Sequence, residues 1–364
     1  MTLTGFVLLY IAATIAIGVI AATRVKNTSD FALAGRSLPL PMVITATFAT
    51  WFGSETILGL PGRFIESGIA GVIEEPFGSG MALILVGTFF AHKLYKQNIL
   101  TLGDYYRDRY GRSVELLCSV AIVISYLGWV GAQVTALGLV INLITEGAVS
   151  MTTGMVIGAA VVLAYTMVGG MWSVAMTDFV QMIVIVVGLV AILWFATDLA
   201  GGMDKVVDYA RGRDLFHAFP EPTTTGWLFW ISAAMTMMIG SIPQQDVFQR
   251  VMSAKNLPTA VAGPILGGSF YILFAFVPMF IVAILVMPDA AEKMLSEDPQ
   301  QLLPTLVRDY MPMWLRVVFF GAVLSAVMST ASATMLAPST IFVENVLRHF
   351  MKIDDRNMLR AMRL

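Results

Sequence analysis

Long apolar runs dominate the chain, and short polar stretches separate them. A helix needs about 20 mostly apolar residues to cross a bilayer, and the runs are long enough for this. We therefore predict an all-α bundle of nine membrane-spanning helices. The predicted spans are residues 3–22, 42–64, 71–91, 114–144, 152–168, 173–196, 227–242, 260–287 and 313–343.

The composition supports a membrane protein. Hydrophobic residues make up 57% of the chain and charged residues 13%, whereas a soluble domain carries about 25% charged residues. The lone Cys118 rules out a disulfide framework. Because the chain has no basic-aromatic run, nucleophile elbow, phosphate loop or zinc-binding helix, we expect neither a nucleic-acid partner nor enzyme chemistry.

The loop charges predict the orientation. With the N-terminus outside, the inner segments hold 15 of the 22 Lys and Arg residues. The positive-inside rule then places the C-terminus in the cytoplasm. We expect an integral membrane protein with partly helical caps at 198–226 and 288–312 over the outer mouth.

Two predicted spans contain helix-breaking residues. Residues 53–56 (GSET) lie in the middle of span 42–64, and residues 59–62 (GLPG) follow them. The span 227–242 ends at Gly240, Ser241 and Pro243. Glycine and proline weaken a helix, and a break at membrane depth marks an ion or substrate site in secondary transporters.

The spacing of the breaks predicts an inverted repeat within one transmembrane domain, 1–364. We expect a leading helix at 3–22, a first repeat at 42–196 and an incomplete second repeat at 227–343. Residues 344–364 form a cytoplasmic tail or connector in this interpretation.

The last predicted span has a hydroxylated face. Ser325, Ser329 and Ser332 fall at i, i+4 and i+7, on one side of a helix, with Thr330 beside them. Hydroxyl groups without a charged neighbour suit sodium, and carbonyl groups freed by the first break would complete its shell. The alternative is that small hydroxylated residues let helices pack closely.

Several motifs together resemble one family. They are GLPG at 59–62, TLGDYYRDRYGR at 101–112, Gly169-Gly170 with Thr177, Asp178 and Gln181, QQDVFQR at 244–250, and the serine-rich last span. In this order they resemble the sodium:solute symporter family. The resemblance implies a leucine-transporter-type fold, a location in a bacterial cytoplasmic (inner) membrane, and alternating access driven by a sodium gradient.

The resemblance also implies ion ligands. The main sodium site would use the carbonyl groups of Ala49, Phe52 and Ala326 and the hydroxyl groups of Ser329 and Thr330. A second sodium site would use Asp178 and Ser332, although Ala333 replaces a further serine. Asp178 has two other interpretations, a proton carrier and a helix-fixing hydrogen-bond acceptor.

Acidic, aromatic and amide residues cluster near the breaks. We hypothesise a small zwitterionic or amine-bearing solute, with Glu55 or Glu75 facing its positive end. The alternative is that Glu55 caps the broken backbone and that Glu74 and Glu75 face outer water. The candidate substrate-binding residues are Trp51, Gly53, Ser54, Glu55, Thr56, Glu75, Trp129, Gln133, Gln244 and Gln245.

The sequence thus predicts a sodium-coupled importer of a small organic solute; the alternative is a solute-sensing input module of a signalling protein. The ten-helix core that the resemblance implies needs two more spans after residue 343. We therefore expect a fragment, or a shortened form that a partner or a second copy completes.

Overall fold

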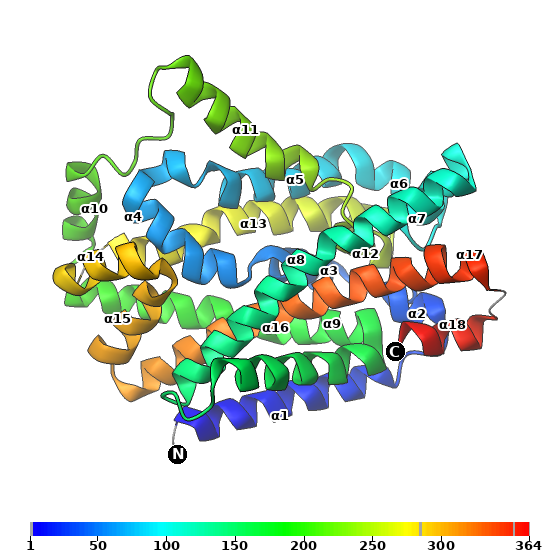
Figure 1. Cartoon of the computed structure of the whole chain (residues 1–364), viewed down its shortest axis with the longest axis horizontal. Coiled ribbons are helices and arrows are strands. Elements are labelled where there is room, and N and C mark those ends of the chain that lie inside the picture. The colour runs from blue at the N-terminus through cyan, green and yellow to red at the C-terminus, as the bar shows by residue number, and fades with distance from the viewer. Residues whose placement is uncertain (1–2, 284–285, 352–353, 364) are drawn as a thin grey trace.

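A computed structural model describes residues 3–283, 286–351 and 354–363. All its named elements in these ranges are helices, and the longest of them run along one common direction (Figure 1). The two chain ends lie at opposite ends of the bundle.

The first part of the chain is a leading helix followed by an interrupted one. Asn27 caps a short helix between them by accepting a hydrogen bond from the backbone N–H of Asp30. The elements are α1 (Leu3–Ala22), α2 (Thr28–Leu33), η1 (Ala34–Arg36), α3 (Leu40–Trp51), η2 (Glu55–Gly59) and α4 (Leu60–Gly71).

Two long segments and a short helix follow. A capping box at Thr101 and Asp104 starts the short helix. The elements are η3 (Ile73–Gly78), α5 (Ser79–Leu85), η4 (Val86–Phe90), α6 (Ala91–Gln97), α7 (Leu102–Tyr110) and α8 (Arg112–Ile144).

Helix α9 (Met151–Leu199) is divided at Gly170, whose backbone is not helical (φ 50°, ψ −139°). A Cβ atom there would come within 2.4 Å of the Phe31 carbonyl oxygen, so only glycine fits. A straight helix of 49 residues would be about 73 Å long, far more than a bilayer needs. The two arms correspond to the predicted spans 152–168 and 173–196.

The second part contains the other interrupted helix. Helices α11 and α12 meet at a 45° bend after Gly240. The elements are α10 (Met203–Gly212), α11 (Thr224–Gly240), α12 (Gln245–Ser253), α13 (Leu257–Ala283), α14 (Pro288–Glu297), η5 (Pro299–Gln301), α15 (Leu302–Tyr310), α16 (Met313–Ile341), η6 (Phe342–Leu347), α17 (Arg348–Phe350) and α18 (Asp355–Met362).

By length and composition, six helices in the described ranges are able to cross a membrane, or seven if α11 and α12 form one span. The kink in α9 and the interruption after α3 account for the difference from the nine predicted segments. The predicted span 227–242 covers most of α11 and ends before α12, which is buried throughout. Residues 284–285 of the predicted span 260–287 lie outside the described residues.

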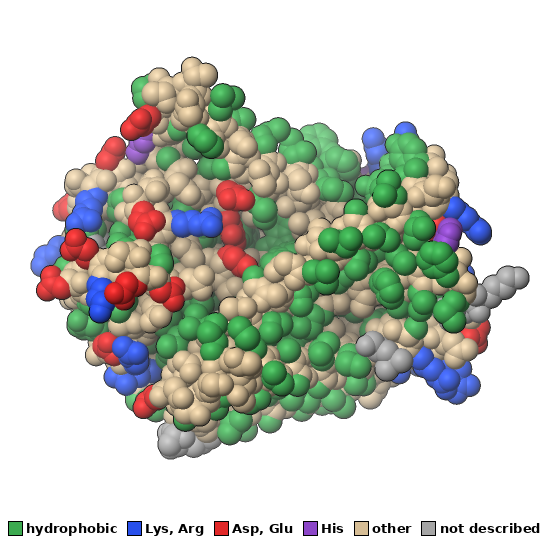
Figure 2. All heavy atoms as spheres, in the orientation of Figure 1, with side chains coloured by type: hydrophobic (Ala, Val, Ile, Leu, Met, Phe, Trp, Pro, Cys, Tyr) green, Lys and Arg blue, Asp and Glu red, His purple; other side chains and the backbone are tan. Residues whose placement is uncertain are grey.

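Helix α16 lies at the centre of the bundle and packs against α3, α8 and α9. Most of its residues are buried. The outer helices expose large apolar side chains, such as Leu8 of α1 and Phe229 of α11. Figure 2 shows charged side chains gathered toward the two ends of the molecule and apolar ones between them. This distribution is typical of an integral membrane protein.

Candidate functional site

The first helix break lies between α3 and η2. Helix α3 ends at Trp51, and Phe52 leaves the helical conformation (φ −78°, ψ 71°). The Gly53 N–H donates to the Trp51 carbonyl over 2.9 Å, which forms a tight turn. The predicted break at 53–56 therefore begins one residue earlier, and the chain then continues as the π-helical η2.

Helix α16 contacts this break with two hydroxyl groups. Ser329 and Thr330 both donate to the Ala49 carbonyl, over 3.2 and 3.3 Å. A Cβ atom on Gly53 would lie 2.8 Å from the Thr330 hydroxyl oxygen, so glycine permits this close approach. Phe52 and Ala326 are fully buried beside it. Three of the residues predicted for the main sodium site, Ala49, Ser329 and Thr330, thus lie in hydrogen-bond contact. We call the region of the five predicted residues the hydroxyl cleft (Ala49, Phe52, Ala326, Ser329 and Thr330).

Asp178 of α9 adjoins the hydroxyl cleft. Its Oδ1 atom accepts a hydrogen bond from the Ser329 hydroxyl over 2.5 Å, while its buried Oδ2 atom has no hydrogen-bond partner in the described part of the chain. The Ser332 hydroxyl donates to the Ser329 carbonyl of its own helix, over 2.8 Å. Ser325 instead pairs with Tyr10 of α1. The predicted serine face is therefore shared between different neighbours.

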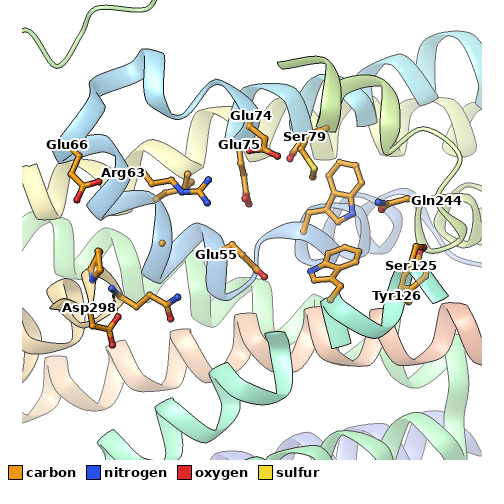
Figure 3. A pocket seen from close by; sticks show the side chains of 17 residues that line it. Glu55, Arg63, Glu66, Glu74, Glu75, Ser79, Ser125, Tyr126, Gln244 and Asp298 are labelled. Carbon is orange, nitrogen blue, oxygen red and sulfur yellow. Dashed lines mark hydrogen bonds between the residues drawn. The ribbon is translucent and has the colours of Figure 1, made fainter. Parts of the chain in front are cut away.

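A pocket of about 710 Å³ lies on the other side of the break. Figure 2 shows acidic side chains in a hollow of this face. In Figure 3, Gln244 and Tyr126 lie at one end of the pocket, Glu66 and Asp298 at the other, and Glu55 and Glu75 between them. The pocket is lined by Trp51, Glu55, Gly59, Leu60, Arg63, Glu66, Glu74, Glu75, Ser79, Ser125, Tyr126, Trp129, Met237, Gln244, Asp298, Pro299 and Gln300.

The two central carboxylates are held differently. Gln133 of α8 donates to both oxygen atoms of Glu55, over 3.0 and 3.1 Å, and Ser54 donates over 3.2 Å. Glu55 is therefore oriented by side chains and does not cap the broken backbone through any hydrogen bond that the structure describes.

Glu75 is fixed by hydroxyl groups at the break. It accepts hydrogen bonds from Thr56, over 2.7 Å, and from Tyr271 of α13. The same two hydroxyl groups lie 2.9 Å apart. Glu75 thus connects η3, the first break and α13.

Five of the ten predicted substrate residues line the pocket: Trp51, Glu55, Glu75, Trp129 and Gln244. Four others support it or the break: Ser54, Gln133 and Thr56 bond to the two glutamates, and Gly53 faces Thr330. Gln245 lies outside the pocket, because its Oε1 atom accepts from the Leu102 N–H over 2.9 Å. Gln244 is the N-cap residue of α12 and has an extended backbone, whereas Gln245 is the first helical residue, so the two side chains face different regions.

Sequence reasoning missed several pocket residues. Tyr126 precedes Trp129 by three positions and shares its helix face, a spacing that could have identified it. Asp298 carried no comparable signal, because η5 reaches the pocket only through the fold. Arg250 of α12, although basic, is fully buried.

The start of the motif TLGDYYRDRYGR, with the buried residues Thr101 and Asp104, takes part in a polar cluster at the end of the bundle away from Glu66. Asn345 of η6 donates to Asp104 over 3.1 Å and to Glu115 over 2.9 Å, and accepts from Thr101 over 2.6 Å. Arg107 pairs with Asp104 over 3.0 Å. The cluster joins α7, α8 and η6.

The described geometry can be compared with known proteins. A family model described as "Sodium:solute symporter family" matches residues 31–364. The chain belongs to the sodium:solute symporter family. Symporters of this family are thus its relatives, as the motifs predicted.

Curated relatives include high-affinity choline transporters. The chain is 28% identical to those of Caenorhabditis elegans and Homo sapiens, over 88% and 96% of its length. It is 26% identical to sodium/glucose cotransporter 4 of Danio rerio over 93% of its length. These matches span 56%, 63% and 57% of the respective relatives, and all three are transporters, not enzymes.

Among solved structures, a Na⁺-coupled sialic acid symporter in a substrate-bound outward-open state has the same fold. The TM-score is 0.86 and the identity is 18%; the match covers 100% of this chain and 77% of the symporter. The family member described here therefore has the predicted leucine-transporter-type fold.

Proposed function

We propose that this chain is the membrane domain of a sodium-coupled importer of a small organic solute with a positively charged group. One observation carries the proposal: residues 49–56 form part of the hydroxyl cleft on one side and of an acidic, aromatic pocket on the other. A single broken segment is thus in a position to bind an ion and a solute together.

The hydroxyl cleft suits a sodium ion. The carbonyl groups of Ala49, Phe52 and Ala326 and the hydroxyl groups of Ser329 and Thr330 are the ligands that we propose, and they carry no net charge. Two of these hydroxyl groups already converge on the Ala49 carbonyl. Asp178 supplies a nearby carboxylate with one unpartnered oxygen atom, and we propose that Asp178 and Ser332 form a second ion position.

The pocket suits an organic cation. Its lining includes five carboxylates (Glu55, Glu66, Glu74, Glu75 and Asp298) and one basic residue, Arg63. Trp51, Tyr126 and Trp129 add aromatic faces, which attract quaternary ammonium groups such as that of choline. The relatives named for choline transport agree with this chemistry. Arg63 would meet the carboxylate of a zwitterionic solute.

Coupling would follow from the shared segment. Sodium between α3 and α16 would stabilise the broken backbone, and the ordered backbone would favour solute binding to Glu55. Binding is reciprocal, so solute should raise sodium affinity by the same factor. Loss of sodium to the cytoplasm would then release the solute by alternating access, with the N-terminus outside.

Uptake by the full-length natural protein in proteoliposomes tests this proposal. Radiolabelled choline should accumulate with an inward sodium gradient and not with potassium alone. Proline, glucose and sialic acid should be tested as competitors of choline uptake. They represent a zwitterion, a sugar and an anion, so their effects show which class of solute the pocket accepts. Sodium-independent uptake, or competition by glucose alone, would overturn the proposal. Sodium and choline binding without any flux would favour the sensor alternative.

A further inference from the structure

A buried carboxylate lies beneath the Gln244 end of the pocket. One oxygen atom of Asp246, Oδ2, accepts a hydrogen bond from the indole N–H of Trp51 over 3.1 Å. The other, Oδ1, accepts one from the Tyr126 hydroxyl. Asp246 is fully buried, and Trp51 and Tyr126 are 4% and 3% exposed. Asp246 thus connects α12 to both α3 and α8.

The contact with Tyr126 is double. The Asp246 backbone N–H donates to the Tyr126 hydroxyl oxygen over 3.0 Å, while that hydroxyl donates to the Asp246 carboxylate. Two hydrogen bonds between the same pair of residues fix the phenol ring more firmly than one. The tyrosine is therefore oriented by the start of α12.

The position of Asp246 explains how its carboxylate is stabilised inside the bundle. It is the second residue of α12, directly after the second helix break, where the helix dipole favours a negative charge. Arg250 lies one turn further along and donates from Nη1 to the Asp246 carbonyl over 3.1 Å. The buried acid thus has two hydrogen-bonding aromatic partners and a cationic neighbour.

These hydrogen bonds determine how the aromatic side chains are presented. The indole N–H lies in the ring plane, so its bond to Asp246 fixes the plane and leaves the ring faces free. Tyr126 stacks on Trp129, with ring centroids 6.0 Å apart. Trp51, Tyr126 and Trp129 all line the pocket. One carboxylate therefore holds two of these three rings directly and the third through stacking.

We propose that Asp246 is a positioning residue for solute binding: it holds Trp51 and Tyr126 in the orientation that receives the cationic group and connects them to the second broken helix. This inference rests on the proposed function. Asp246 does not line the pocket, so it acts through the two rings. A solute that contacts these rings would thereby be coupled to α12 through their hydrogen bonds to Asp246.

Asp246→Asn in the full-length protein tests the role. An amide has one acceptor oxygen in place of two, so either Trp51 or Tyr126 loses its partner. The concentration of choline for half-maximal uptake should rise about tenfold or more, because hydrogen bonds to charged groups are the strong ones. The increase in melting temperature that sodium causes in the absence of choline should stay within twofold of the wild-type increase. Asp208→Asn, an exposed carboxylate on α10, is the matched control.

A double-mutant cycle separates positioning from general packing. Trp51→Phe and Tyr126→Phe each remove one donor while keeping an aromatic ring. If Asp246 acts through these donors, Asp246→Asn should change choline affinity much less in either background than in the wild type. Additive effects in both backgrounds would overturn the proposal.

A spectroscopic measurement covers the case in which choline is not the solute. With 5-fluorotryptophan labelling, the Trp51 fluorine resonance is identified by its loss in Trp51→Phe. It should shift in Asp246→Asn and not in Asp208→Asn. An unshifted resonance would overturn the positioning role, whereas absence of choline uptake by the wild type would overturn the proposed function instead.

Discussion

The two sides of the first helix break present different kinds of oxygen atoms. Toward α16, the break meets neutral groups, the Ala49 carbonyl and the hydroxyls of Ser329 and Thr330. Toward the pocket, it meets the carboxylates of Glu55 and Glu75 beside aromatic rings. Compact neutral oxygen ligands suit a small dehydrated ion, whereas separated carboxylates and rings suit a larger organic cation. One irregular segment thus faces two chemically different environments.

Gly53→Ala should impair the hydroxyl cleft and the pocket together and therefore have the largest effect on uptake. The added methyl group would lie 2.8 Å from the Thr330 hydroxyl oxygen, and overpacking costs about 1–3 kcal/mol. We expect uptake to fall about 100-fold at limiting sodium and solute, since each 1.4 kcal/mol is about tenfold. Initial uptake rates in proteoliposomes measure this. Gly131→Ala, where a Cβ atom would meet open space, should behave as wild type; equal loss in both variants would contradict the interpretation.

Ser329→Ala should act on the sodium side. It removes the hydroxyl group that contacts both Ala49 and Asp178. The sodium concentration for half-maximal uptake should rise about tenfold or more, because hydrogen bonds to charged groups contribute about 1.5–3 kcal/mol. Sodium titration of thermal stability is the measurement. Ser269→Ala, a hydroxyl bonded within its own helix, is the control, and unchanged sodium stabilisation in Ser329→Ala would place the ion elsewhere.

Glu55→Gln should act on the pocket side. The substitution keeps the size of the side chain and removes its charge, so the apparent affinity for cationic solutes should fall about fivefold to tenfold. Sodium stabilisation measured without solute should change little, because Glu55 bonds to Ser54 and Gln133 and to no residue of the hydroxyl cleft. Competition assays with choline and an uncharged analogue would detect the difference. An equal loss for both compounds would mean that charge recognition is not its role.

Tyr271→Phe should moderately weaken both sodium binding in the hydroxyl cleft and solute binding in the pocket. Its hydroxyl group bonds to Thr56 and to Glu75, which lines the pocket, and its ring packs against Phe52 of the hydroxyl cleft, so the variant loosens contacts on both sides of the break. We expect a loss of about 1 kcal/mol in stability and an effect of a few-fold on both sodium and solute affinity. Melting temperature and both titrations should be measured together. A change confined to solute affinity would mean that Tyr271 supports the pocket alone.

Glu66→Gln should have the smallest effect. Glu66 is exposed at the outer end of the pocket, where a charge chiefly steers arriving cations. We expect the uptake rate to fall about twofold at low ionic strength and to be unchanged at high salt, where screening removes the contribution. Initial rates across a salt series test this; a loss that persists at high salt would indicate direct solute contact.

The local sequence was informative about where helices break. Gly53 and the Gly240-Ser241-Pro243 run interrupt helices where their backbone properties predicted. The helical spacing of Ser325, Ser329 and Ser332 similarly predicted that they lie along one helix, α16, whereas the contact of Ser329 with Ala49 was expected only from the family resemblance. In these cases backbone conformation and helical period act over a few residues, so they can be read from the chain.

The hydrogen-bond partners of individual polar side chains could not be predicted from the local sequence. Gln244 and Gln245 are adjacent and chemically identical, yet only Gln244 lines the pocket. The burial of Arg250 likewise depends on the neighbours of α12 and not on its local sequence. Asp246 gave no sign that it would meet Trp51 and Tyr126, which are 195 and 120 positions away. Such contacts depend on how helices rotate and pack.

The sequence by itself determined the apolar segments, the two breaks and the hydroxylated face of the last long helix, because each follows from local composition and periodicity. Only the tertiary structure decided that Ala49 meets Ser329, that Glu75 bonds to Tyr271, and that Asp246 holds two aromatic rings. These pairings join residues that are far apart in the chain, and helix packing brings them within hydrogen-bond distance.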